Sequence, residues 1–205
     1  MQLEENSIKK MQAYNPNDHM FINFTLLLGS FLWYLILAPS IGLLAIIYMV
    51  LGYYLSAFVF YNIHRHPLHR RAKATRAIFD LHTNVHHKFF SENPITITEI
   101  EQYQFVLMPS GVIVSLVLIV YPLAFYFLDS VFSESLAYWL LIGAQWMFIQ
   151  YEICHLHSHS DDSAFSAFQH INKMALNHRK HHENCQYNFG IATDVFDKYY
   201  NTKAK

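Results

Sequence analysis

Charged side chains are scarce in this 205-residue chain. Asp, Glu, Lys and Arg together make up 14% of its residues, whereas hydrophobic residues make up 53%. A typical soluble domain carries roughly 25% charged residues. The net charge of −1 excludes a strong electrostatic attraction to nucleic acid, so no nucleic acid partner is expected. The shortage of charge instead indicates a chain in contact with lipid.

Cysteine is scarce, and the sequence has no features typical of a disulfide scaffold, a cleavable signal peptide or an internal repeat. Cys154 and Cys185 have no spacing typical of a disulfide scaffold, so we expect two reduced thiols in or near a reducing compartment. The first twenty residues are polar and include Lys9 and Lys10, so we expect no cleavable signal peptide. The length fits one domain, without a repeat of fixed period or a low-complexity tract.

Long apolar runs are what the chain has in abundance. Each is close to the roughly 20 residues that a helix needs to cross the hydrocarbon core of a membrane. We therefore predict an all-α integral membrane protein with four transmembrane helices. A buried helical bundle in a soluble protein is the alternative, and the length of the runs argues against it. The four runs are residues 21–39, 41–63, 105–128 and 136–153.

The distribution of basic residues predicts the orientation of these helices. All 14 Lys and Arg residues lie in three polar segments: an arm at 1–20 and two histidine-rich segments at 64–104 and 154–205. With four crossings, these three segments share one side of the membrane. The positive-inside rule makes that side the cytoplasm, so both termini are predicted to be cytoplasmic, together with a helical cap rich in histidine.

Ten histidines are grouped in four short boxes within the two histidine-rich segments. Neutral imidazole is a common ligand of zinc, iron and copper. One zinc ion takes four ligands and one iron ion at most about six, so ten imidazoles favour a site for two metal ions. The ten candidate ligands are His64, His69, His82, His86, His87, His155, His159, His178, His181 and His182.

Helical spacing predicts which of these rings share a face. Residues three or four apart lie on one side of an α-helix. His82 and His86 have that spacing, as do His155 and His159. His87 is turned by about 100° from its neighbour, so we expect it to serve a second metal ion. His178, His181 and His182 are expected on one stripe of a later helix.

The first box fits a straight helix less well. His64 and His69 are five residues apart, and we expect Pro67 to disturb the helix so that both rings point the same way. His66 remains an alternative ligand. His157 lies between two predicted ligands and is expected on another face, at the surface or behind the ligands.

Two further histidines, His19 and His170, stand outside the boxes. A lone surface histidine is usually only solvated, and we expect this of both.

The order of the boxes resembles that of the membrane fatty acid hydroxylase and sterol desaturase superfamily. Residues 178–197 resemble its HxxHH box, followed by Asn-Phe-Gly and a downstream Asp. Residues 151–159 read Tyr-Glu-x-x-His-x-x-x-His and are similar to another of its boxes. Residues 61–69 resemble the first box, and residues 86–88 resemble the second. The four boxes in this order make the resemblance specific over about residues 55–202.

This resemblance implies a non-haem centre of two Fe²⁺ ions. Such a centre uses O₂ to hydroxylate, or in some members to desaturate, an unactivated C–H bond of a lipid such as a fatty acyl chain or a sterol. Zinc can replace iron in the purified protein. The side chains expected to support the ligands are Glu152, Asp194 and Asp197, as hydrogen-bond partners of imidazoles, and Asn188, as a polar group near the metals.

The same resemblance implies an electron donor. Some members carry a fused cytochrome b5 domain, and this sequence contains none. We therefore expect a separate donor, which is a cytochrome b5-like protein, a ferredoxin-like protein or a reductase.

Two other functions compete with lipid hydroxylation. Carotenoid ring hydroxylases have a similar four-helix plan and related histidine boxes, and the Tyr-Glu and Asn-Phe-Gly elements favour the fatty acid or sterol branch over them. A non-catalytic metal-binding membrane protein is the second alternative. Metal transport is disfavoured because transporters place ionisable ligands inside membrane helices, whereas these histidines lie outside the four runs.

Overall fold

A computed structural model describes residues 15–91, 95–160 and 164–204, and these residues form helices and loops without a β-strand. Of the predicted polar arm, residues 1–14 lie outside this description. The helices are α2 (Pro16–Leu37), α3 (Leu43–Ile63), η1 (His64–Leu68), α4 (Arg76–Phe79), η2 (Asp80–His87), η3 (Ile100–Gln102), α5 (Tyr103–Val106), α6 (Ser110–Ser115), η4 (Leu116–Val120), α7 (Tyr121–Val131), α8 (Glu134–Ser158), α9 (Gln169–Glu183) and α10 (Val195–Tyr199). The prediction of an all-α fold is confirmed.

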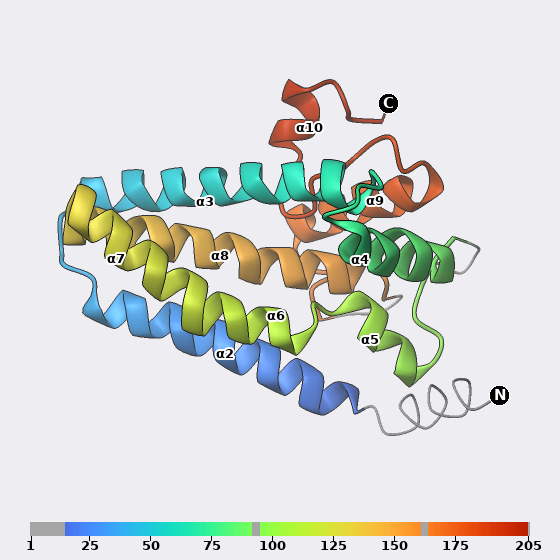
Figure 1. Ribbon diagram of the computed structural model, residues 1–205, viewed down its shortest axis with the longest axis horizontal. Coiled ribbons are helices and arrows are strands. Elements are labelled where there is room, and N and C mark those ends of the chain that lie inside the picture. Colours follow the sequence, from blue (N-terminus) through green and yellow to red (C-terminus); the bar gives the residue numbers. More distant parts are fainter. Residues whose placement is uncertain (1–14, 92–94, 161–163, 205) are drawn as a thin grey trace.

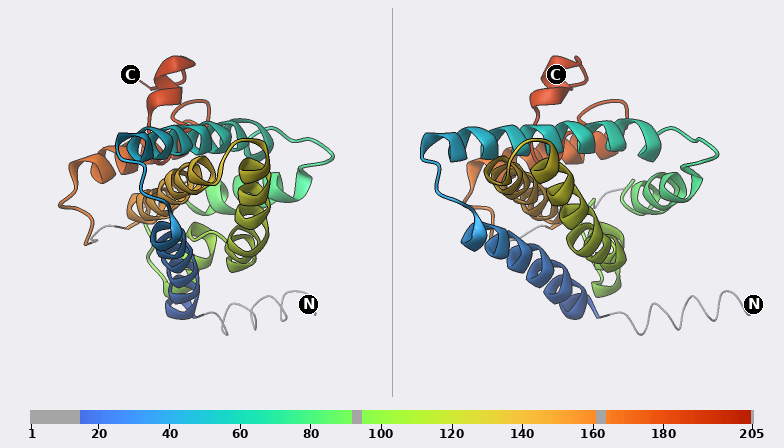
Figure 2. Two further views of the ribbon diagram at one scale, coloured as in Figure 1. Left: turned by 90° about the vertical axis from the view of Figure 1, so that its left-hand side faces the viewer. Right: turned by 60° about the vertical axis from the view of Figure 1, so that its left-hand side comes forward.

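The long helices run side by side along the longest dimension of the molecule (Figure 1). Helix α2 begins earlier than predicted because the Asn15 side chain accepts a hydrogen bond from the Asn17 N–H at 3.0 Å, with Pro16 in the first turn. The third run is interrupted near Pro109, and the helix continues through α6, η4 and α7. Helix α8 contacts α2, α3 and α7, so it is the helix around which the others pack (Figure 2).

Three candidate membrane spans result, at Pro16–Leu37, Leu43–Leu68 and Ile100–Val131. Each is long and apolar enough to cross a membrane. Helix α8 forms where the fourth run was predicted but is not among these candidates, because it carries polar residues such as Gln145 and Glu152, which are 0% and 1% exposed. Its neighbours cover these side chains, so its composition does not have to match lipid.

The outer faces of the other long helices are strongly apolar. Ile36 of α2, Leu43 of α3 and Leu123 of α7 are 78%, 71% and 64% exposed. Contiguous exposed apolar surface on this scale is unusual for a soluble monomer and typical of contact with another apolar phase. The exposed faces therefore support contact between these three spans and the bilayer.

Helices α3 and α8 approach closely at two glycines. A Cβ atom on Gly52 would overlap the carbonyl oxygen of Leu140, and one on Gly143 would overlap the carbonyl oxygen of Met49. Small residues at a helix interface allow this close backbone approach in membrane proteins. The contact fixes the two helices whose ends carry His64 and His155.

Gly143→Ala is expected to destabilise the protein by about 1–3 kcal/mol, because the added methyl group must push α3 and α8 apart. Thermal unfolding in detergent measures this loss. Gly29→Ala is the matched control, since a Cβ there meets no atom within 4 Å. Equal stability of the two variants would contradict the close α3–α8 contact.

Candidate metal centre

Two short π-helical turns determine how the first two histidine boxes are presented. A π-helix bonds residue i to i+5, so residues five apart share a face. The π-helix η1 begins at His64 and brings it to the same side as His69. The π-helix η2 ends at His87 and likewise aligns it with His82. The predicted pairing of His82 with His86 is therefore wrong, because it assumed α-helical spacing.

The first group of converging imidazoles contains His64, His69, His82, His87 and His181, whose candidate ligand atoms all lie within 4.8 Å of one another. The Nε2 atom of His82 lies 3.0 Å from that of His64, 3.1 Å from that of His69 and 3.2 Å from that of His87. His181 joins from α9, with its Nε2 atom 2.9 Å from that of His69. These five nitrogens face a common point.

The second group contains His86, His159, His178 and His182. The Nε2 atom of His182 lies 3.1 Å from that of His86 and 3.1 Å from that of His178. His155 lies beside this group, with its Nε2 atom 3.4 Å from that of His86. The expected stripe on α9 is divided, because His181 faces the first group while its two companions face the second.

The two groups are direct neighbours. His86 and His87 are adjacent in sequence and belong to different groups, as the turn between them predicts. The rings of His87 and His182 stack across the boundary, with their centroids 4.1 Å apart. The fold thus brings all ten predicted ligands into one cluster with two centres.

Backbone carbonyls orient several of these rings. The Nδ1 atom of His64 lies 2.6 Å from the Phe189 carbonyl oxygen, and that of His86 lies 2.8 Å from the Phe105 oxygen. The Nδ1 atom of His159 lies 2.9 Å from the Ile95 oxygen, and that of His181 lies 2.6 Å from the Tyr187 oxygen. A nitrogen this close to a carbonyl oxygen must carry the proton. The Nε2 lone pair of each ring is then directed at the centre, as metal ligation requires.

Burial keeps the rings neutral. Desolvation lowers the pKa of His69 and His86 to about 4 and the pKa of His181 to about 3. Burial also lowers the pKa of His87 and His182, and neighbouring imidazoles add to the effect. Neutral imidazole is the form that binds metal, so the site is ready for ligation at neutral pH.

The residues fit a pair of transition metal ions. The Nε2 atom of His159 belongs to a fully buried side chain and has no hydrogen-bond partner within the described chain. A buried nitrogen acceptor without a partner is costly unless something else binds it. An all-imidazole set suits zinc, copper or iron and is unlike the oxygen-rich sites of calcium or magnesium.

The four predicted supporting side chains have other partners than the imidazoles. Glu152 accepts a hydrogen bond from the Met108 N–H at 3.3 Å. Asp194 pairs with three lysines, among them Lys173 at 3.0 Å. The Asn188 side chain accepts from the Ala204 N–H at 3.0 Å. Imidazole contacts were expected of the three carboxylates only, and backbone carbonyls hold the rings instead.

Asp197 acts through the backbone of the Asn-Phe-Gly segment. Its carboxylate accepts hydrogen bonds from the N–H groups of Phe189 and Gly190 and from the Thr202 hydroxyl, each at 2.8 Å. The Phe189 carbonyl in turn orients His64. This buried carboxylate therefore holds the segment that positions a candidate ligand.

Sequence reasoning missed one side-chain contact. The Cys185 sulfur lies 3.4 Å from the Nδ1 atom of His87. The proximity of Cys185 to the last box in the sequence was the only available signal.

The remaining histidines lie outside both groups. His157 is buried, and its ring contacts the Asn172 side chain at 2.6 Å. His66 is half-buried at the surface. His19 and His170 are not merely solvated as expected, because their rings bond the Met108 and Ala192 carbonyls, each at 2.9 Å.

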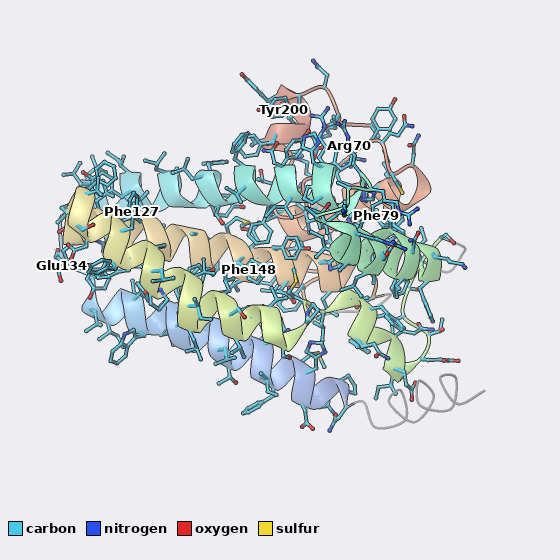
Figure 3. The ribbon with its side chains drawn as sticks, viewed as in Figure 1. Arg70, Phe79, Phe127, Glu134, Phe148 and Tyr200 are labelled. Atoms are coloured by element: carbon cyan, nitrogen blue, oxygen red, sulfur yellow. The ribbon has the colours of Figure 1, made fainter. Side chains whose placement is uncertain are left out.

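An apolar cavity adjoins the first group. His64 is part of its wall, and α3 and α8 supply half of the other lining residues, including Ala57, Phe60, Met147 and Tyr151. The segment 189–193 closes it. Figure 3 marks Phe148, a buried residue of α8, about midway along the bundle. The cavity is small, about 20 Å³, and it places an apolar lining next to the candidate metal ligands.

Comparison with known proteins identified one family and one similar structure. The fatty acid hydroxylase family profile matches residues 49–202. The structure described as full-length Scs7p, with only its hydroxylase domain visible, is similar with a TM-score of 0.62 at 20% identity. The match covers 91% of this chain and 66% of that chain, so the present chain spans slightly less than two thirds of it. No curated protein matched significantly.

Proposed function

Since the chain belongs to the fatty acid hydroxylase family, we propose that it is a membrane oxygenase that uses O₂ to hydroxylate an unactivated C–H bond of a lipid, such as a fatty acyl chain or a sterol. The observation that carries this proposal is the pair of adjacent, buried, all-histidine groups beside an apolar cavity. Desaturation of the same bond is the alternative outcome at such a site.

Two iron ions are the proposed cofactor. His64, His69, His82, His87 and His181 would hold one, and His86, His155, His159, His178 and His182 would hold the other. When bound, iron supplies the activation of O₂ that amino acid side chains alone cannot provide. Zinc can occupy the same ligands in purified protein, because zinc lies above ferrous iron in the order of divalent metal affinities.

The protein itself would orient the ligand rings and exclude water from the site. The carbonyls of Phe189, Phe105, Ile95 and Tyr187 hold the Nδ1 protons and thereby fix the ring orientations. The apolar lining of the small cavity would contact the part of the lipid chain next to His64 and would keep water from the reacting carbon. Because His64 is shared by the cavity and the first group, the bound chain would lie next to that metal ion.

We also propose four membrane crossings, with α8 as the fourth. Its 25 residues, at 1.5 Å each, are sufficient for a core of roughly 30 Å. Four crossings place the segments 1–20, 64–104 and 154–205 on one side. The basic residues in these segments support a cytoplasmic location for that side and for both termini.

The proposed reaction requires electrons from a separate donor. A cytochrome b5-like protein, a ferredoxin-like protein or a reductase would supply them.

Metal analysis tests the two-ion proposal. Protein purified anaerobically and reconstituted with Fe²⁺ is expected to retain about two ions per chain, since ten imidazoles exceed the capacity of one ion. His66→Ala is the matched control, because His66 lies outside both groups, and it should retain both ions. A stoichiometry of one or none in the unmodified chain would contradict the proposal.

A further inference from the structure

The candidate metal ligands differ in how close they lie to the surface. Eight of the ten histidines are buried. His69 and His82, both in the first group, are the two that remain partly exposed. Their Nε2 atoms lie 3.1 Å apart. Among the ten rings, this pair is therefore where the cluster comes nearest to the surrounding solution.

The surface around this pair is basic. Residues 65–81, called here the docking surface, contain five Lys or Arg residues and one acidic residue, Asp80, in a chain whose net charge is −1. Arg70, Arg71, Lys73 and Arg76 are exposed. Asp80 offsets one of them, with its carboxylate 3.4 Å from the Arg76 guanidinium. The docking surface therefore carries a strong local positive charge.

Apolar side chains accompany these charges. Ile78 and Leu81 are 43% and 50% exposed. The helices η1, α4 and η2, which carry the docking surface, contact one another, and the Thr83 hydroxyl bonds the Leu68 carbonyl at 2.6 Å. Exposed apolar residues near a charged, polar margin are the usual arrangement of a protein–protein interface. The docking surface therefore has the character of a protein-binding site.

Its place in the fold favours a protein over a lipid. In Figure 1, α4 and the helix that continues it extend beyond the end of α3, away from the loops at the other end of the bundle. Figure 3 marks Arg70 and Phe79 in the same region. Residues 65–68 form the end of the candidate span Leu43–Leu68, whereas residues 69–81 belong to none of the three candidate spans. Ile78 and Leu81 are therefore exposed on a segment that is not a candidate for crossing the membrane.

We propose that the docking surface binds a one-electron carrier protein whose own surface is acidic around its cofactor. This inference rests on the proposed function, which needs a reductant. Opposite charges steer such a partner into place, and His69 and His82 are the ligands that lie nearest to it. Each docked carrier would give up one electron to the iron that these ligands would hold. Two electrons, two protons and O₂ convert one C–H bond into an alcohol and one water.

Charge reversal tests the docking surface. The full chain, loaded with iron in phosphatidylcholine nanodiscs, is mixed with the haem domain of a cytochrome b5 and, separately, with a ferredoxin, both chosen for acidic surfaces. Arg71→Glu combined with Lys73→Glu is expected to weaken carrier binding about tenfold or more at low salt. The matched control reverses Lys88 and Lys180, two exposed lysines outside the docking surface, and should bind like the unmodified chain.

The second readout is electron delivery. On anaerobic mixing with protein whose iron has first been oxidised to Fe³⁺, reoxidation of the reduced carrier should slow by a similar factor in the variant, whereas dithionite with a small viologen mediator should reduce both proteins equally. Failure of the unmodified chain to bind either carrier would contradict the proposal, as would equal weakening by the control. A loss seen only in nanodiscs containing phosphatidylserine would assign the surface to lipid headgroups instead. Absence of product with the mediator would contradict the proposed function while leaving the binding result intact.

Discussion

His181→Ala is expected to abolish hydroxylation and to reduce the metal content from about two ions per chain to about one, because it removes one imidazole of a five-ring group. His181 is fully buried, and its Nδ1 proton is held by the Tyr187 carbonyl at 2.6 Å. The truncation therefore removes an oriented ligand from the interior of the group. Metal analysis and a product assay on the same preparation measure both effects.

The second group provides the complementary variant. His159→Ala should also reduce the metal content to about one ion, through loss of the other site. The double variant should then bind close to none. If His181→Ala alone removed both ions, the two groups would not bind metal independently. If it retained both ions and full activity, the first group would not be a metal site.

Asp197→Asn is expected to weaken metal binding about tenfold to a hundredfold, although Asp197 contacts no candidate ligand ring directly. The carboxylate serves three donors with its two oxygens. An amide has a single acceptor oxygen, so at least one N–H of the Phe189–Gly190 segment loses its partner. The Phe189 carbonyl then no longer holds His64 firmly. Titration of the metal-free protein with Fe²⁺ measures the affinity.

Asp194→Asn is the matched control for this prediction. Asp194 lies close in sequence and is also buried, but its carboxylate pairs with Lys173, Lys198 and Lys203 rather than with the segment beside His64. Its replacement should leave the iron affinity unchanged. An equal loss in both variants would mean that Asp197 acts only through general stability and does not position His64.

The candidate site was predictable in content but only partly in pairing. Ten histidines on one predicted side of a membrane indicated a metal cluster, and the structure brings all ten together. The pairing of His64 with His69 was expected, and Pro67 lies inside the π-helical turn that brings them together, whereas the pairing of His82 with His87 depends on a second π-helical turn and was not expected. A π-helix bonds residue i to i+5 instead of i+4, so the α-helical period of 3.6 residues does not reveal which side chains share a face in such a turn. The available signal for these turns was the spacing of five residues between two histidines in each of the first two boxes.

The fold was predictable from the apolar runs, with one exception. The three candidate spans coincide closely with predicted runs because lipid-exposed helices must be apolar along most of their length. Helix α8 differs because its neighbours cover Gln145 and Glu152. A single sequence does not reveal which helix will be central. The role of Asp197 was hidden for a similar reason, since the motif does not reveal that its carboxylate accepts hydrogen bonds from the backbone N–H groups of Phe189 and Gly190.

Lipid analysis of cells tests the central claim, which is hydroxylation of a lipid by this metal centre. Cells supplied with iron and expressing both candidate carriers would produce either the unmodified chain or His181→Ala, and mass spectrometry would compare their lipids. We predict a species heavier by one oxygen atom in the first cells and its absence in the second. A species lighter by two hydrogen atoms would establish desaturation instead. Identical lipids in both, from a chain that retains its two metal ions, would contradict the account.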